Sequence, residues 1–474
     1  MRLPVLVSVS TIIFSLAALP QVPIQTRLRS IRWGPYQDRA VTLLQQYLRI
    51  DTSNPPGREI NAAEFFHSLF DEAGIPNRTY RYAPERANFC AVLKGDGSLR
   101  PLVLLNHMDV VRADEQKWKV SPFSGGIVGG EIYGRGAEDM KNEGLLQAMV
   151  LLVAAREKLP LKRDLIFLAT ADEEVNDTGS AWILNNHPEL VRQAEYLITE
   201  GGSNIIQEQA RNGVKAVYGI GVAEKAPFWI RMTATGRGGH GSIPINDSAP
   251  DLLALAMARI VTWETPIHLL PLVEEYFHQT AVLQQGARVS QFRNIRKAVK
   301  NARFAEQLTD DEHYNYLLRD TVSITVMKSG QQTNVIPETA YCDLDVRLLP
   351  GDEPGAFLAQ LRAELDDDSI QLTPLSKFRQ PNSSPTDTSL YRIIQQVVRE
   401  HNPQALVVPT LNSGYTESQM YRQLGIKCYG FVPIEVTPEV EATEHAANER
   451  VPVEQIRRGV KVLSEVVIRA ANEP

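Results

Sequence analysis

Acidic and imidazole side chains recur in this chain at places where they could bind metal ions. Each one directly follows a short apolar run or opens a helical stretch. The residues in this pattern are His107, Asp109, Asp139, Glu173, Glu174 and Glu200. Several carboxylates gathered in one crevice repel one another unless a cation sits among them. If the fold brings these residues together, the sequence predicts a metal site, and their number favours two metals.

The apolar runs before these residues predict buried parallel strands. Residues 102–105 and 165–169 are continuously apolar, and residues 196–199 are apolar up to Thr199. These runs alternate with helical patterns, which is typical of strands covered on both faces. In open α/β sheets the functional crevice lies at the carboxyl ends of the strands. The side chains that follow the runs are therefore expected to converge there.

Composition indicates a soluble globular protein with more than one domain. The chain has 474 residues, which exceeds the size of an ordinary single core. Of these residues 43% are hydrophobic and 22% are charged, as is typical of soluble globular proteins. The net charge is -7 and no basic stripe occurs, so no nucleic-acid partner is expected. The three cysteines lie in strand-like runs and are interpreted as buried small hydrophobes.

The first 20 residues predict a signal peptide or a membrane anchor. Arg2 precedes an apolar stretch over residues 3–19, and Ala17 and Ala18 provide small residues near a possible cleavage point. This pattern favours an exported protein, periplasmic or extracellular. An uncleaved anchor over residues 3–19 is the alternative.

The rhythm of predicted elements divides the rest of the chain into three stretches. Strand-like and helical segments alternate over residues 30–221, which we interpret as the first part of a catalytic α/β domain. Residues 222–375 show an alternating strand, helices and further strands without metal-ligand clusters, which predicts an inserted α+β domain. The α/β rhythm returns over residues 376–474, the second part of the catalytic domain.

Five sequence motifs, at residues 106–111, 133–141, 170–174, 200–202 and 444–450, together resemble one known family. It is the di-zinc amidohydrolase and exopeptidase family that includes aminoacylase, succinyl-diaminopimelate desuccinylase, acetylornithine deacetylase, glutamate carboxypeptidase and the carnosinases. The resemblance implies a zinc-exopeptidase-like mixed sheet flanked by helices, with an inserted ferredoxin-like α+β lid or dimerisation domain. The matching stretches occur in the family's order.

The resemblance also implies a ligand set for two metals. Asp139 would bridge them, with a cis peptide bond after it. His107 and Glu200 would complete one site, and Glu174 and His445 the other. Nitrogen and oxygen ligands without sulfur fit Zn²⁺, although Co²⁺ or Mn²⁺ could occupy the same cage.

Further residues are expected to take part in catalysis. The strand period places Asp109 on the same side as His107, where its carboxylate could accept the other imidazole N–H. By resemblance, Glu173 would act as general acid and base. His240 would stabilise the oxyanion, often from the partner subunit of a homodimer joined through the inserted domain.

Substrate-binding residues are also implied by the resemblance. They are Asn334, Arg347, and Gly414 and Thr416 in a loop that resembles a Gly-Thr-Asp motif of the family. Glu417 replaces the usual aspartate of that loop. Arg347 could grip an α-carboxylate in a bidentate fork, and an ordinary ion pair on the sheet face is the alternative.

The sequence thus favours a zinc-dependent metallopeptidase of the exopeptidase or carboxypeptidase type. It would hydrolyse an amide bond near a free carboxylate in short peptides. The first alternative is an N-acyl-amino-acid deacylase that uses the same site. A catalytically silent metal-binding protein is the more remote one. A serine hydrolase is disfavoured because no Gly-x-Ser-x-Gly elbow follows a strand.

Overall fold

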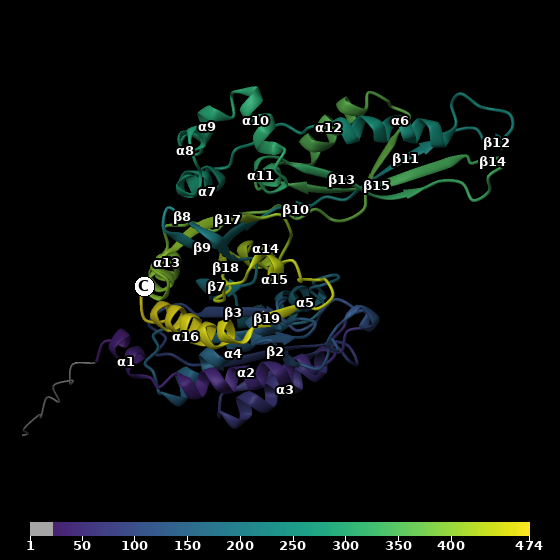
Figure 1. Ribbon diagram of the computed structural model, residues 1–474. Coiled ribbons are helices and arrows are strands. Elements are labelled where there is room, and N and C mark those ends of the chain that lie inside the picture. Colours follow the sequence, from purple (N-terminus) through teal and green to yellow (C-terminus); the bar gives the residue numbers. More distant parts are fainter. Residues whose placement is uncertain (1–21) are drawn as a thin grey trace, which may run out of the picture.

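The chain folds into two units, one above the other in Figure 1. The computed structural model describes residues 22–474, so the predicted leader or anchor at residues 1–20 lies outside the described part. The lower unit is built on a 9-stranded sheet and the upper one on a 5-stranded sheet. No helix within residues 22–474 has both the length and the apolar character needed to cross a membrane.

The large sheet is mixed, as predicted. Strand β3 pairs in parallel with β6 and β7, whereas β2 pairs antiparallel with β6. The strand order is β1-β2-β6-β3-β7-β18-β9-β17, and β8 pairs with β9. The strands are β1 (Asn77–Arg81), β2 (Ala87–Leu93), β3 (Leu102–His107), β6 (Leu165–Thr170), β7 (Tyr196–Thr199), β8 (Ser203–Arg211), β9 (Val214–Glu224), β17 (Ala405–Asn412) and β18 (Lys427–Gly430).

Both faces of the large sheet are covered by helices, which explains the continuous apolar runs. In β3, Leu102 and Leu104 belong to one hydrophobic core, whereas Val103 and Leu105 belong to the core on the opposite face. The first core is completed by α2 (Gly34–Leu48), α3 (Glu59–Glu72), α4 (Lys141–Arg156), α13 (Ser389–His401) and α16 (Val453–Ala470). The second core is completed by α5 (Thr178–Asn186) and α14 (Ser418–Arg422).

Short elements complete the lower unit. A 3-stranded sheet has the order β19-β5-β4 and links two distant parts of the chain. The short elements are α1 (Ile24–Ser30), η1 (Glu115–Lys117), β4 (Ile127–Val128), β5 (Glu131–Tyr133), η2 (Pro188–Leu190), α15 (Pro438–Glu441) and β19 (Arg450–Pro452).

The upper unit is an antiparallel sheet with two helices packed on one face, an α+β arrangement. Alternate residues of β15 are buried, and they pack in one core with residues of helices α6 and α12. The opposite face of the sheet is turned toward the lower unit (Figure 1). The elements are β10 (Ala226–Pro227), β11 (Ile230–Thr235), β12 (Gly239–His240), α6 (Ala249–Thr262), β13 (Thr321–Lys328), β14 (Val335–Ile336), β15 (Thr339–Leu348), α12 (Pro354–Leu365) and β16 (Gln371–Pro374).

A helical segment lies at the joint between the two units. It comprises α7 (Pro271–Thr280), η3 (Ala281–Leu283), α8 (Ala287–Arg293), α9 (Ile295–Ala298), α10 (Ala302–Thr309) and α11 (Glu312–Leu318). Its core includes Ala223 of β9 and Leu411 of β17, so it packs on the large sheet although it falls within the predicted insert 222–375. The buried Lys225 Nζ, at the end of β9, donates to the carbonyl oxygens of Tyr316 (3.3 Å) and Arg319 (2.9 Å). These contacts hold the helical segment at the joint between the two units.

Candidate metal centre

The parallel strands bring three of the predicted ligand positions to one edge of the large sheet. His107 is the last residue of β3, Glu174 follows β6, and Glu200 directly follows β7. Asp139 comes from the loop before α4, and His445 from the loop before β19. The peptide bond between Asp139 and Met140 is cis, as the family resemblance implies.

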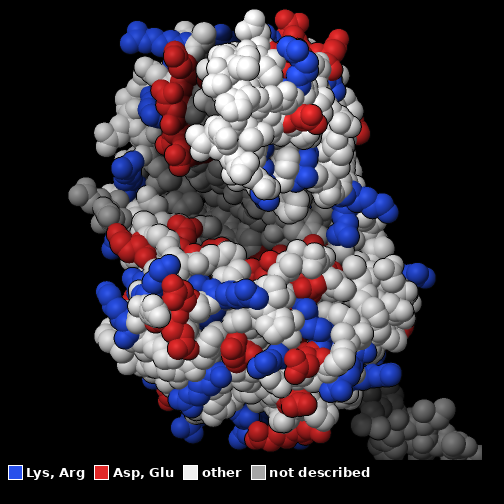
Figure 2. Space-filling view, turned by 90° about the vertical axis from the view of Figure 1, so that its right-hand side faces the viewer, with Lys and Arg blue, Asp and Glu red and all other residues white. Residues whose placement is uncertain are grey.

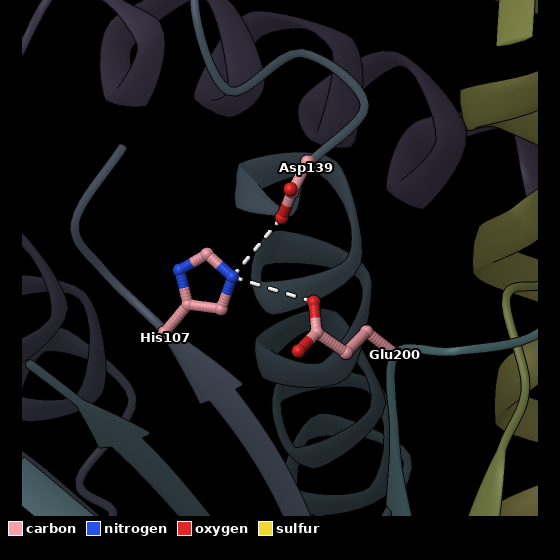
Figure 3. Close-up of side chains that lie close together, drawn as sticks. All are labelled: His107, Asp139 and Glu200. Atoms are coloured by element: carbon pink, nitrogen blue, oxygen red, sulfur yellow. Dashed lines mark hydrogen bonds and ion pairs between the residues drawn. The ribbon is translucent and has the colours of Figure 1, made fainter. Parts of the chain in front are cut away.

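His107, Asp139 and Glu200 form the first group of possible ligands. His107 Nε2 lies 3.0 Å from Asp139 Oδ1 and 3.3 Å from Glu200 Oε2. Figure 3 shows both carboxylates directed at the same ring nitrogen. One ligand atom from each residue fits within 4.8 Å of the others, a separation suited to a single ion.

A second group shares Asp139 with the first. His445 Nε2 lies 2.8 Å from the other carboxylate oxygen of Asp139, Oδ2, and 3.3 Å from Glu174 Oε2. Glu444 also belongs to this group, because its carboxylate lies within 4.8 Å of ligand atoms of Asp139 and His445. Asp139 thus stands between two imidazoles and offers one oxygen to each group.

The site is deficient in positive charge. Burial alone would lower the pKa of His107, but Glu200 and Asp139 raise it well above its usual value. Burial and then the Glu200 carboxylate raise the pKa of Glu173 well above its usual value. Glu174 Oε1 is buried without a hydrogen-bond partner. Desolvated, mutually repelling carboxylates and an orphaned oxygen are the features that bound cations would satisfy, so the residues present fit a metal centre.

The Asp109 carboxylate has different partners from those expected. His107 Nδ1 lies 3.0 Å from the backbone carbonyl oxygen of Asp109, whereas the carboxylate Oδ1 is 3.8 Å away. The carboxylate instead accepts the backbone N–H groups of Glu173 (3.1 Å) and Glu174 (3.2 Å), together with the side-chain amide of Asn54 (2.8 Å). These three donors turn it away from the imidazole. In this structure Asp109 therefore positions the Glu173–Glu174 turn, and its main chain orients His107.

Two residues without a predicted role hold the loop that carries Asp139. The Glu449 carboxylate accepts Arg135 Nη1 at 2.6 Å and the backbone N–H of Asp139 at 3.1 Å. It also accepts the backbone N–H groups of Gly136 (2.9 Å) and Glu138 (2.8 Å). Both residues lie inside the motifs that carry the family resemblance. Their pairing over 314 positions is visible only in the folded chain.

A cavity of about 370 Å³ opens beside the metal centre. Gly414 and Thr416 line it, as expected for substrate-binding positions, and so does Tyr415. The wall is strongly acidic, and no Lys or Arg among the described residues lines it. Burial and then nearby carboxylates raise the pKa of Glu138 to about 9 and that of Glu444 to about 7. Figure 2 shows the hollow between the two units, with acidic side chains along its lower edge.

Three predicted residues lie outside this cavity. His240 and Asn334 are exposed. His240 ends β12, which pairs with β14, and Asn334 directly precedes β14, at the far tip of the upper unit in Figure 1. Arg347, on β15, makes a bidentate ion pair with Asp345, at 2.7 Å (Nε–Oδ1) and 3.1 Å (Nη2–Oδ2). The sheet-face ion pair, the alternative interpretation of Arg347, is thus the arrangement found.

A mixed α/β sheet that presents two imidazole–carboxylate groups around a shared aspartate defines the class of metal-dependent hydrolases acting on amide bonds. A profile of the family described as "Peptidase family M20/M25/M40" matches residues 103–469. The chain belongs to this family, as the sequence motifs predicted.

Proteins with similar sequences include an N-fatty-acyl-amino acid synthase/hydrolase and an aminoacylase. The human N-fatty-acyl-amino acid synthase/hydrolase PM20D1 is 30% identical over 418 residues, which cover 86% of this chain and 82% of that protein. Rat aminoacylase-1A is 26% identical over 451 residues, or 93% of this chain and 98% of that protein.

Solved structures share the fold across nearly the whole chain. A metallo-carboxypeptidase of the M20 family from Sulfolobus solfataricus superposes with a TM-score of 0.68 at 17% identity, covering 92% of this chain and 100% of that one. Human carnosine dipeptidase 1 also gives a TM-score of 0.68, at 15% identity, covering 96% of this chain and 100% of that one. At these identities the likeness concerns the fold alone.

Proposed function

We propose that this protein hydrolyses the amide bond of N-acyl amino acids that carry a free carboxylate, using two Zn²⁺ ions held in the cavity. The observation that carries the proposal is Asp139, which offers one carboxylate oxygen to each of two imidazole-containing groups. His107 and Glu200 would complete one metal site, and His445 and Glu174 the other. Nitrogen and oxygen donors without sulfur suit zinc, and Co²⁺ or Mn²⁺ could substitute. When bound, such ions supply Lewis acidity and lower the pKa of water.

Glu173 is the proposed general base and acid. Its carboxylate lines the cavity, with Oε2 3.9 Å from His107 Nε2, and its backbone N–H is held by the Asp109 carboxylate. Glu173 would accept a proton from the attacking water and then deliver it to the leaving amide nitrogen. Its side chain is only 13% exposed, which limits its contact with bulk water.

An apolar part of the cavity wall supports an apolar acyl group in the substrate. Val432, Ile434 and Val436 line the cavity together with the acidic residues. A charged acyl group such as a dicarboxylate would find no Lys or Arg among the described residues of this wall to pair with. Similarity to the human N-fatty-acyl-amino acid hydrolase supports the same substrate class.

Exopeptidase activity on short peptides is the second candidate. It is favoured by the acidic side chains Glu441 and Glu444 in the cavity wall, which could pair with the free amino group of a peptide. The two candidates share the amide bond, the metal centre and Glu173. They differ only in the acyl part of the substrate, which carries a free amino group in a peptide and lacks it in an N-acyl amino acid.

A panel of substrates separates the two candidates. The zinc-loaded protein would be offered N-acyl amino acids and dipeptides with the same C-terminal residue, each with a free or an amidated carboxylate. We expect faster turnover of the N-acyl compounds, and general-base removal in Glu173→Gln should slow it by about 10²–10⁴-fold while metal content is unchanged. Glu454→Gln, at an exposed position, is the matched control. Full activity in Glu173→Gln would refute its proposed role.

A homodimer through the upper unit is also proposed. Exposed apolar side chains lie on α6 and on β13, with Leu255 66%, Val261 75% and Met327 67% exposed. Burying them against a second copy would remove apolar surface from water, and His240 could then reach the cavity of that copy. Light scattering should show a dimer that Val261→Asp converts to a monomer with reduced activity. A monomeric wild-type protein with full activity would contradict this.

Export of the protein is proposed on the sequence of residues 1–20 alone. N-terminal sequencing of protein recovered from the culture medium or periplasm should give a start shortly after residue 18. Intact protein in the membrane fraction would instead support the anchor.

A further inference from the structure

The free carboxylate of the proposed substrate needs a cationic partner, and the cavity wall does not contain one. No Lys or Arg in residues 22–474 lines the cavity. A carboxylate placed among acidic side chains would be repelled unless a guanidinium or ammonium group met it. Such a group must therefore come from just outside the wall.

Two other arginines that could be considered for this role are already paired. Arg347 is bound in bidentate fashion to Asp345. Arg422, behind the Thr416 loop, is buried and ion-paired with Glu224. Freeing either side chain would leave an unpaired carboxylate behind, so each is a poor donor for substrate.

Arg379 lies beside the cavity and forms no such ion pair among the described residues. It belongs to the segment that returns from β16 to the lower unit. Its Nη1 donates to the hydroxyl of Tyr415 at 3.1 Å, and Tyr415 lines the cavity between Gly414 and Thr416. Gln419 Nε2 donates to the backbone carbonyl of Arg379 at 3.0 Å, which fixes the segment at this place.

The guanidinium of Arg379 retains most of its hydrogen-bonding capacity. An arginine has five N–H donors, and the bond to Tyr415 uses one of them. Arg379 is exposed, and within the described residues it forms no ion pair at 4.0 Å or less. Its charge also acts on the nearby Asp177. Burial raises the pKa of Asp177 to about 7, against the opposing effects of a Tyr415 hydrogen bond and of Arg379.

We propose that Arg379, seated on the Tyr415 hydroxyl, binds the free carboxylate of the substrate and makes the enzyme selective for it. This assignment rests on the proposed hydrolysis of N-acyl amino acids. The selectivity would come from the joint between the two units rather than from Arg347 on the upper sheet. A purely structural alternative exists, in which Arg379 only offsets the charge of Asp177.

The test compares an N-acyl amino acid with its α-carboxamide, which lacks the negative charge. Arg379→Met should lower kcat/KM for the free acid by about 10- to 100-fold, the range expected for charge-assisted hydrogen bonds, and leave the carboxamide within about threefold. Arg379→Lys should recover part of the loss. Lys377→Met removes an exposed charge two residues away and should change neither substrate. The same pair of substrates would be measured with Arg347→Met.

Several outcomes would overturn the proposal. An equal loss on both substrates would assign Arg379 the structural role beside Asp177. Loss of selectivity in Arg347→Met, with Arg379→Met unchanged, would assign the carboxylate to Arg347.

Binding measurements separate this proposal from the proposed reaction. Calorimetry on Glu173→Gln, with and without Arg379→Met, would compare binding of the free acid and of the carboxamide. Tighter binding of the free acid that disappears with Arg379→Met supports the carboxylate site even if no turnover is found. Equal binding of the two ligands by Glu173→Gln would refute it, whether or not the wild-type protein hydrolyses them.

Discussion

Replacing Glu449 by glutamine tests whether a buried carboxylate holds the loop that carries Asp139. Glu449 is 0% exposed and its partner Arg135 is 3% exposed. One carboxylate oxygen accepts Arg135 Nη1 and the Gly136 N–H, and the other accepts the N–H groups of Glu138 and Asp139. All four bonds therefore end on one side chain.

The cost of Glu449→Gln follows from this geometry. The amide oxygen can still accept the Glu138 and Asp139 N–H groups, but the amide nitrogen would face the donors of Arg135 and Gly136. The guanidinium would stay buried without its counter-charge, and breaking a buried pair in this way costs about 3–5 kcal/mol. With a urea dependence near the upper end of the usual range, the unfolding midpoint should fall by about 1 M or more.

Urea unfolding followed by tryptophan fluorescence measures this shift. Glu454→Gln is the matched control, because its side chain is 82% exposed and its nearest partner, Arg457 Nε, lies 3.6 Å away. Such an exposed pair contributes roughly 0–1 kcal/mol. Combined with Arg135→Met, Glu449→Gln should cost less than the sum of the two single changes, because the unpaired guanidinium is gone. The reasoning is refuted if Glu449→Gln shifts the midpoint no more than the control does.

Three further outcomes are expected. Burial lowers the pKa of Lys225 to about 7. The unfolded chain then binds this proton more tightly, so the stability of the wild type relative to Lys225→Met should rise from pH 7 to about pH 10, by up to about 1.4 kcal/mol per pH unit in urea titrations. Arg163→Met should cost about 3–5 kcal/mol in the same assay, because this fully buried guanidinium donates to Glu195 at 2.6 Å; a loss below about 1 kcal/mol would contradict this. Chelation should lower the melting temperature of the wild type but not that of Asp139→Asn, and equal shifts would place the metal elsewhere.

The sequence predicted the layout of the large sheet well because its strands are buried on both faces. Continuous apolar runs such as residues 102–105 have few other interpretations, and parallel pairing then brings the residues after them to one edge. Parallel pairing places His107, Glu174 and Glu200 at this edge. The loops that carry Asp139 and His445 meet them there. Strand ends shifted by one or two residues: the run 102–105 lies in β3 (Leu102–His107) and the run 165–169 in β6 (Leu165–Thr170).

The sequence could not predict which hydrogen-bond partner each polar side chain would take. The strand period placed Asp109 beside His107, but it could not show that two backbone N–H groups and Asn54 would compete for the carboxylate. Likewise, Arg347 carries a charge that suits a substrate, and only the folded sheet shows Asp345 already paired with it. Where a polar side chain has several possible partners, tertiary contacts determine which partner it binds.

Selectivity for the free carboxylate of the substrate is expected to arise at the edge of the cavity. A cavity lined by many carboxylates attracts cations of any kind and repels the carboxylate of an N-acyl amino acid. Two bound metal ions would neutralise the centre, but they are needed at the amide carbonyl. The positive charge that binds the substrate carboxylate therefore has to come from a different place. The segment around Arg379 is anchored at the cavity edge by Gln419 and Tyr415.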